Sequence, residues 1–124
     1  LNMTYGNITK INTNKAYFES IFINLLTNSL KYRSKNRDLI IDIAVTQEEN
    51  DTIRILFKDN GIGIDLERNK NKIFGLYQRF HDYPDSKGLG LFLVKSQIET
   101  IGGSISIQSE VEKGTEFTLT FKSQ

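Results

Sequence analysis

The stretch Asp59-Asn60-Gly61-Ile62-Gly63-Ile64 follows a run, residues 52–58, in which β-branched and aromatic side chains alternate with polar ones. This alternation predicts a strand with one buried face. Side chains on a strand repeat every second residue, so Asp59 ends an apolar row made by Ile53, Ile55 and Phe57. A carboxylate in that position needs a hydrogen-bond donor, because burying an unpaired charge is costly.

Gly61 and Gly63 stand directly after this carboxylate and allow the backbone to turn and a flat ligand to approach closely. A buried acceptor beside two glycines suits the amino group of a purine base. Asp-Gly and Asn-Gly also form ordinary hairpin turns, and for these six residues alone a plain turn is the more common case. Motifs elsewhere in the chain are needed to distinguish a ligand site from a plain turn.

The composition describes one ordinary globular domain, residues 1–124, with 38% hydrophobic and 25% charged residues. Sixteen basic and fifteen acidic residues leave a formal charge of +1, which gives no general argument for binding nucleic acid or a membrane surface. The sequence has no cysteine, which excludes disulfides, thiolate catalysis and sulfur-bound zinc. No apolar run approaches the ~20 residues of a membrane span. Because the chain starts at Leu1, we expect a fragment of a longer protein.

A basic run follows the first predicted helix and consists of Lys31, Arg33, Lys35 and Arg37. Polar residues are interleaved with it, which favours a solvated loop over a nucleic-acid-binding surface.

Apolar residues recur at intervals of three and four from residue 14 to about residue 32, which predicts an amphipathic helix. These positions are Phe18, Ile21, Phe22, Leu25, Leu26 and Leu30. Any of residues 12–14 could cap this helix. Asn24 and Asn28 stand one turn apart at the edge of the apolar stripe, where polar groups need partners.

The remaining pattern predicts strands over residues 39–45, 52–58, 104–109 and 116–121, with turns at 47–51 and 112–115. Ile105, Ile107, Phe117, Leu119 and Phe121 are expected to point inward. Helices are predicted over 66–72, 73–80 and 88–101, the last closed by Gly102-Gly103. Residues 1–13 read as a short edge strand or an extended segment, and 81–87 as a loop. The predicted fold is an α/β sandwich of the α+β class, with a mixed, mainly antiparallel sheet of about five strands and helices on one face.

Gly88-Leu89-Gly90 opens the helix predicted over 88–101. The first N–H groups of a helix lack intrahelical acceptors and lie at the positive end of its dipole, so a phosphate placed there satisfies them. Lys87 adds a positive charge. The spacing matches neither the P-loop nor the dinucleotide-binding fingerprint.

Five motifs in order resemble the catalytic ATP-binding domain of sensor histidine kinases, and they cover residues 15–121. They are Asn24 to Tyr32, Asp59 to Gly63, Ile73 to Phe80, Gly88 to Leu91, and Gly114 to Phe117. These correspond to the N box, first glycine box, F box, second glycine box and final Gly-Thr strand of that family. The wider superfamily, which shares the Bergerat fold, includes ATPase domains of gyrase, a heat-shock chaperone and mismatch-repair proteins.

The resemblance implies a role for each residue that binds the base. Asp59 would accept from the adenine amino group, Gly61 and Gly63 would let the base lie close, and Thr115 would hold it through water. Ile64 and Tyr32 would line the base pocket.

The resemblance also implies the residues that handle Mg-ATP phosphates. Asn28 would bind Mg²⁺, with Asn24 and Lys31 near the phosphates and the backbone from Gly88 through Leu89, Gly90 and Leu91 around them. Arg79 and Lys87 would neutralise charge as the γ-phosphoryl group moves, under a lid formed by 81–87. The implied catalytic residues are therefore Asn28, Lys31, Arg79 and Lys87.

The resemblance implies transfer to a histidine on a separate dimerisation domain, with a response regulator downstream. We expect a cytoplasmic, monomeric fragment that contacts neither nucleic acid nor membrane. Asn24 replaces the glutamate by which ATP-hydrolysing relatives activate water, so little hydrolysis is expected. Ser86 stands where the family usually has a glycine, and His81, the only histidine, is expected to be a loop residue. Two alternatives stay open: a nucleotide-binding or docking module without transfer activity, and a serine-directed kinase of the anti-sigma type.

Overall fold

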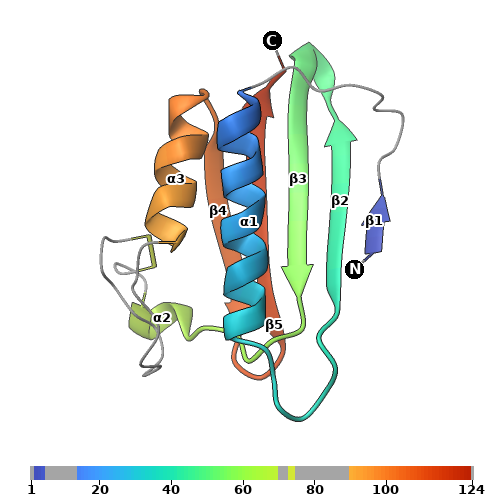
Figure 1. Ribbon diagram of the computed structural model, residues 1–124, viewed down its shortest axis with the longest axis vertical. Coiled ribbons are helices and arrows are strands. Elements are labelled where there is room, and N and C mark those ends of the chain that lie inside the picture. Colours follow the sequence, from blue (N-terminus) through green and yellow to red (C-terminus); the bar gives the residue numbers. More distant parts are fainter. Residues whose placement is uncertain (1, 5–13, 70–72, 75–89, 124) are drawn as a thin grey trace.

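The computed structural model describes residues 2–4, 14–69, 73–74 and 90–123. Its five strands form one sheet in the order β1-β2-β3-β5-β4, and α1 and α3 lie side by side on one face of it (Figure 1). Strand β1 pairs parallel with β2, and the other neighbours are antiparallel. The α/β sandwich with a mixed, mainly antiparallel sheet is therefore confirmed. The elements are β1 (Asn2–Thr4), α1 (Lys15–Lys31), β2 (Ile41–Gln47), the 3₁₀ helix η1 (Glu49–Asp51), β3 (Thr52–Asp59), α2 (Leu66–Asn69), α3 (Gly90–Thr100), β4 (Ser104–Glu110) and β5 (Gly114–Lys122).

Helix α1 begins where the sequence allowed, because the Asn14 side chain caps it and accepts a hydrogen bond from the backbone N–H of Tyr17 at 3.1 Å. Its buried line runs through Ile21, Leu25 and Ser29. The prediction that Leu30 belongs to this stripe is wrong, since 52% of Leu30 is exposed. Five residues of helix rotate Leu30 about 140° away from Leu25, and Ser29 takes the buried position.

The inner face of the sheet confirms the alternation on which the β3 prediction rested. Phe57 lies opposite Phe117 of β5, and Asp59 lies opposite Thr115. Both phenylalanines are fully buried, and the Phe22 ring of α1 packs edge-on against Phe57 with centroids 6.3 Å apart. Asp59 and Thr115 thus end two neighbouring apolar rows on the face that the helices cover.

Strand boundaries differ from the prediction by one or two residues, and at the start of β2 local hydrogen bonds explain the difference. Strand β2 starts at Ile41, not residue 39, since the Asn60 carboxamide accepts from the Ile40 N–H at 2.7 Å and donates to the Asp38 carbonyl at 2.9 Å. Strand β5 starts at Gly114, which pairs with Glu110, so the turn is shorter than predicted. The two predicted inward isoleucines of β4, at the sheet edge, are only half-buried.

Helix α3 ends as its two glycines predict. Gly102 adopts φ +83° and donates to the Glu99 carbonyl at 3.0 Å, and Gly103 donates to the Ile98 carbonyl at 2.8 Å. Residues 70–72, the helix predicted beyond Phe74, the lid 81–87 and the first residues of the helix predicted from 88 lie outside the described residues. None of the described helices is long and apolar enough to cross a membrane.

One end of the sheet collects the segments that the sequence analysis singled out. Figure 1 shows the C-terminal ends of α1 and β3 and the start of β5 at the same end of the molecule, and α3 starts partway along α1 and runs away from this end. A site shared by these segments therefore lies at this end.

Candidate functional site

Asp59 is the centre of this end of the molecule. Only 5% of it is exposed, and both carboxylate oxygens accept hydrogen bonds. Oδ2 accepts from the Ser29 hydroxyl at 2.8 Å, and Oδ1 accepts from the Gly61 N–H at 2.9 Å. The predicted need for donors is confirmed, and the two donors fix the orientation of the carboxylate.

Ser29 is the residue that sequence reasoning missed. It lies on α1, four residues after Leu25, and only 1% of it is exposed. The sequence did contain a signal for it, because Ser29 continues the apolar line through Ile21 and Leu25, and a hydroxyl buried on that line needs a hydrogen-bond partner. The partner is the carboxylate predicted to need a donor.

The two glycines after Asp59 are required by the backbone of the chain itself. A Cβ on Gly61 would lie 2.5 Å from the Tyr32 carbonyl oxygen, and one on Gly63, at φ +74°, would lie 2.2 Å from the Glu110 carbonyl oxygen. The Ile62 N–H also donates to the Tyr32 carbonyl at 2.9 Å. These contacts hold the loop after Asp59 between Tyr32 at the end of α1 and Glu110 at the end of β4. The close approach of a ligand to these glycines stays a prediction.

Thr115 and Ile64 join the same cluster through Ser109. The Ser109 hydroxyl accepts from the Ile64 N–H and donates to the Gly114 carbonyl, both at 2.8 Å, and lies 2.8 Å from Thr115 Oγ1. Since Ser109 has one proton, the hydroxyl of Thr115 is the donor in that pair and keeps its lone pairs as acceptors. Thr115 and Ile64 are 6% and 2% exposed. Tyr32 is buried, and its carbonyl lies against Gly61 and Ile62 of the loop after Asp59, so the predicted base-binding residues lie at the same end of the molecule.

The predicted phosphate-binding residues divide between two helices. Asn24 and Asn28 are half-buried on α1, and Lys31 is exposed at its end. A Cβ on Gly90 would lie 3.7 Å from Asn24 Oδ1, so the start of α3 adjoins Asn24. The Leu91 side chain belongs to the core, which leaves its backbone for any ligand contact.

Four predicted residues, Arg79, Lys87, Gly88 and Leu89, lie outside the described residues.

A magnesium ion fits the donor set that α1 offers. Among the residues that the structure describes, no group of three or more His, Cys, Asp or Glu could hold a metal ion. Mg²⁺ bound with a nucleotide takes few protein ligands, because phosphate and water complete its octahedron. One carboxamide oxygen, that of Asn28, is compatible with such a site.

The prediction of a solvated basic loop is wrong for Arg37. Its side chain is half-buried and donates hydrogen bonds to the carbonyls of Asn60, Gly61 and Glu112. Lys31, Arg33 and Lys35 are exposed, as expected. Arg37 is therefore part of the cluster around Asp59.

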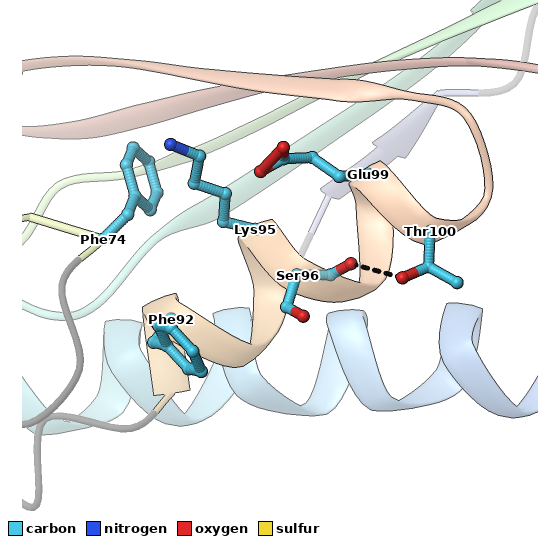
Figure 2. Close-up of a pocket in the computed structure, with 6 residues that line it drawn as sticks. All are labelled: Phe74, Phe92, Lys95, Ser96, Glu99 and Thr100. Carbon is cyan, nitrogen blue, oxygen red and sulfur yellow. Dashed lines mark hydrogen bonds between the residues drawn. The ribbon is translucent and has the colours of Figure 1, made fainter.

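A separate hollow of about 560 Å³ lies along α3 and is drawn in Figure 2. It is lined by Phe74, Phe92, Lys95, Ser96, Glu99 and Thr100. Lys95 Nζ lies 5.8 Å from the centroid of the Phe74 ring, and Thr100 donates to the Ser96 carbonyl. The hollow shares no lining residue with the Asp59 cluster, and none of the six is among the residues predicted to bind a nucleotide.

We expect Ser29→Ala to lower the free energy of unfolding by about 1.5–3 kcal/mol, because a hydrogen bond to a buried carboxylate is lost. Thr27→Ala removes a hydroxyl from the exposed face of the same helix and should be neutral within about 0.5 kcal/mol. Urea denaturation of both variants measures the difference. Equal midpoints would show that the Ser29 hydroxyl contributes no net stability.

Comparison with known proteins matches residues 13–124 to the model of one family, described as histidine kinase-, DNA gyrase B-, and HSP90-like ATPase. Histidine protein kinase SaeS of Staphylococcus epidermidis is 40% identical over 109 residues, which cover 84% of this chain and 30% of that protein. Heme sensor protein HssS of Staphylococcus saprophyticus is 33% identical over 112 residues, covering 90% and 24%. The chain thus spans less than a third of the length of these curated relatives.

Two solved structures share the fold. The mycobacterial sensor histidine kinase MprB superposes with a TM-score of 0.79 at 18% identity, covering 99% of this chain and 82% of that one. Full-length ShkA in complex with AMPPNP also gives a TM-score of 0.79, at 19% identity, covering 99% and 26%. At this identity the similarity concerns the fold alone.

Proposed function

The chain belongs to the family of histidine kinase-, DNA gyrase B- and HSP90-like ATPases, and on that premise we propose that it is the catalytic domain of a sensor histidine kinase. It binds Mg-ATP at the Asp59 end of the sheet. It transfers the γ-phosphoryl group to a histidine on a separate dimerisation domain of the same protein, from which a response regulator takes it. Relatives named as histidine kinases and sensor proteins support this assignment.

The observation that carries the proposal is the buried, doubly anchored carboxylate of Asp59. Its orientation is set before any ligand arrives, by a hydroxyl from α1 and an N–H from the adjoining loop. A preoriented acceptor in a water-poor position recognises a donor such as the adenine amino group at a low entropic cost. Thr115, the register partner of Asp59, adds acceptor lone pairs beside it.

Residues on the helices would hold the phosphates. The half-buried Asn28 would supply one oxygen to Mg²⁺, and the ion would neutralise phosphate charge. Asn24 and Lys31 would bind phosphate oxygens from α1, and the backbone at the start of α3 would contribute N–H donors. Arg79 and Lys87 are proposed to neutralise the moving phosphoryl group.

Transfer is favoured over hydrolysis because of the side chain at position 24. Asn24 lies beside the start of α3 and carries a carboxamide, which cannot accept a proton from water at neutral pH. We therefore expect the chain with Mg-ATP to release inorganic phosphate at close to the rate of ATP in buffer. A phosphate-release assay measures this, and rapid turnover would favour the gyrase-like and chaperone-like ATPases.

The test of function is transfer of label from γ-labelled ATP to the dimerisation domain added in trans. An acid-labile phosphohistidine would support the proposal. An acid-stable serine ester would favour the serine-directed kinase, and no label at saturating nucleotide would favour a docking module. We propose a cytoplasmic location for the domain, where ATP is available, and a monomeric state, since dimer contacts would belong to the separate domain.

A further inference from the structure

Arg37 lies in the connection between α1 and β2 and makes three hydrogen bonds to backbone carbonyls. Its Nε donates to Asn60 O at 2.8 Å, and its Nη2 donates to Gly61 O at 2.7 Å and to Glu112 O at 2.6 Å. Two of these carbonyls belong to the loop after Asp59, and the third belongs to the β4–β5 turn. One side chain therefore joins three segments that are distant in sequence. Figure 1 shows that these segments lie at the same end of the sheet.

The segments that Arg37 joins are also tied to one another. The Glu112 N–H donates to the Ile62 carbonyl at 2.7 Å, and Glu112 has φ +67°, a left-handed conformation that a side chain rarely adopts. Such a conformation persists where surrounding contacts hold it. The bond to the Glu112 carbonyl is one of those contacts.

The guanidinium suits this position for geometric reasons. Its donors lie in one plane at fixed angles, so Nε and Nη2 can serve two consecutive carbonyls while Nη2 reaches a third. A lysine ammonium is a single point on a flexible stem and cannot hold this arrangement. The exchange of Arg37 for lysine therefore keeps the positive charge and removes the planar pair of donors, Nε and Nη2, that binds the carbonyls.

The Arg37 hydrogen bonds act on a residue that orients Asp59. Gly61 accepts a hydrogen bond from Arg37 through its carbonyl and donates one to Asp59 Oδ1 through its N–H. We infer that Arg37 is a positioning residue for base recognition: by fixing the loop 60–62 against the β4–β5 turn, it keeps the Asp59 carboxylate in the orientation that accepts a purine amino group. This inference rests on the proposed function.

The test compares Arg37→Lys with Arg33→Lys, the same exchange at an exposed arginine of the same connection. Dissociation constants for Mg-ATP and Mg-ITP are measured by calorimetry, because inosine lacks the 6-amino group. We expect Arg37→Lys to weaken ATP binding about tenfold, as loss of a charged hydrogen bond implies, and to weaken ITP binding by less than twofold. Arg33→Lys should change neither.

A merely structural role would lower both affinities alike and leave their ratio unchanged, and that result would overturn the inference. Amide exchange of the nucleotide-free protein gives a second readout: the N–H groups of Gly61, Ile62 and Glu112 should exchange faster in Arg37→Lys. Faster exchange with an unchanged ATP-to-ITP ratio would also overturn it.

The two failures are distinguishable. If the wild-type chain binds no nucleotide, that result contradicts both the proposed function and the role of Arg37. A wild-type chain that prefers ATP, with the same preference in Arg37→Lys, would remove this inference alone. If the lysine variant does not unfold cooperatively, Arg37→Gln, which keeps two N–H donors without the fork, takes its place with the same expected loss of preference.

Discussion

Replacing Asp59 with asparagine is expected to abolish the thermal stabilisation that Mg-ATP gives to the folded chain. For the wild type, a ligand at about 100 times its dissociation constant adds about 2.7 kcal/mol to the free energy of unfolding. In a domain of this size that should raise the midpoint of unfolding by roughly 5 to 15 °C. For Asp59→Asn we expect no measurable rise at the same nucleotide concentration.

The reason lies in the number of acceptors. The carboxylate of Asp59 offers two acceptor oxygens, which already receive the Ser29 hydroxyl and the Gly61 N–H and have further lone pairs. An asparagine has one acceptor oxygen in place of two, and the Gly61 N–H already takes one of its two lone pairs. Its NH₂ group then stands where the other oxygen was and repels the amino group of an incoming base.

The same geometry predicts that the variant folds. The asparagine NH₂ group can donate to the Ser29 oxygen, since a hydroxyl accepts as well as donates. The size of the side chain is unchanged. We therefore expect the nucleotide-free midpoint to fall by no more than a few degrees, which separates loss of binding from loss of structure.

Asp65→Asn is the matched control. Asp65 is exposed six residues further along, and its side chain accepts from the Arg68 N–H at the start of α2, which an asparagine can also do. This control should keep the full response to Mg-ATP. An equal response in Asp59→Asn would contradict the adenine role of Asp59, and no response in the wild type at millimolar nucleotide would contradict the ATP site itself.

The part of the site that the sequence predicted is the part that local periodicity controls. The alternation of β3 puts Asp59 on the covered face, and the alternation of β5 puts Phe117 there. Since the side-chain period of a strand is two, one correctly registered pair fixes all the others. The patterns put Asp59 and Phe117 on the covered face, whereas the pairing of β3 with β5, which the patterns do not specify, sets Asp59 opposite Thr115.

The part that the sequence did not predict depends on partners distant along the chain. Ser29 lies 30 residues from Asp59, and Arg37 lies 75 residues from Glu112. A serine within a helical pattern and an arginine within a basic run are ordinary surface residues until the fold brings a carboxylate or a carbonyl to them. The start of β2 was misplaced for the same reason, because the side chain of Asn60 holds Ile40 outside the strand.

Gly63→Ala should cause a large loss of stability, and Gly102 provides its control. Both glycines have positive φ, +74° and +83°, so an alanine suffers the same backbone penalty at either position. That penalty is about 1–2 kcal/mol. At Gly102 the added Cβ meets nothing within 4 Å, whereas at Gly63 it would lie 2.2 Å from the Glu110 carbonyl oxygen.

Of the two alanine variants, only the one at Gly63 therefore forces a neighbouring backbone segment to move. The displaced segment is the end of β4, which holds Ile64 through Ser109 and adjoins the turn that Arg37 clamps. Overpacking adds about 1–3 kcal/mol, so we expect Gly63→Ala to lose about 2–5 kcal/mol in total and Gly102→Ala about 1–2 kcal/mol. Thermal and urea unfolding of the two variants measure both losses of stability. Equal losses would mean that the positive φ alone requires glycine at position 63. A larger loss at Gly63 would mean that the close approach of the two backbone segments requires it as well.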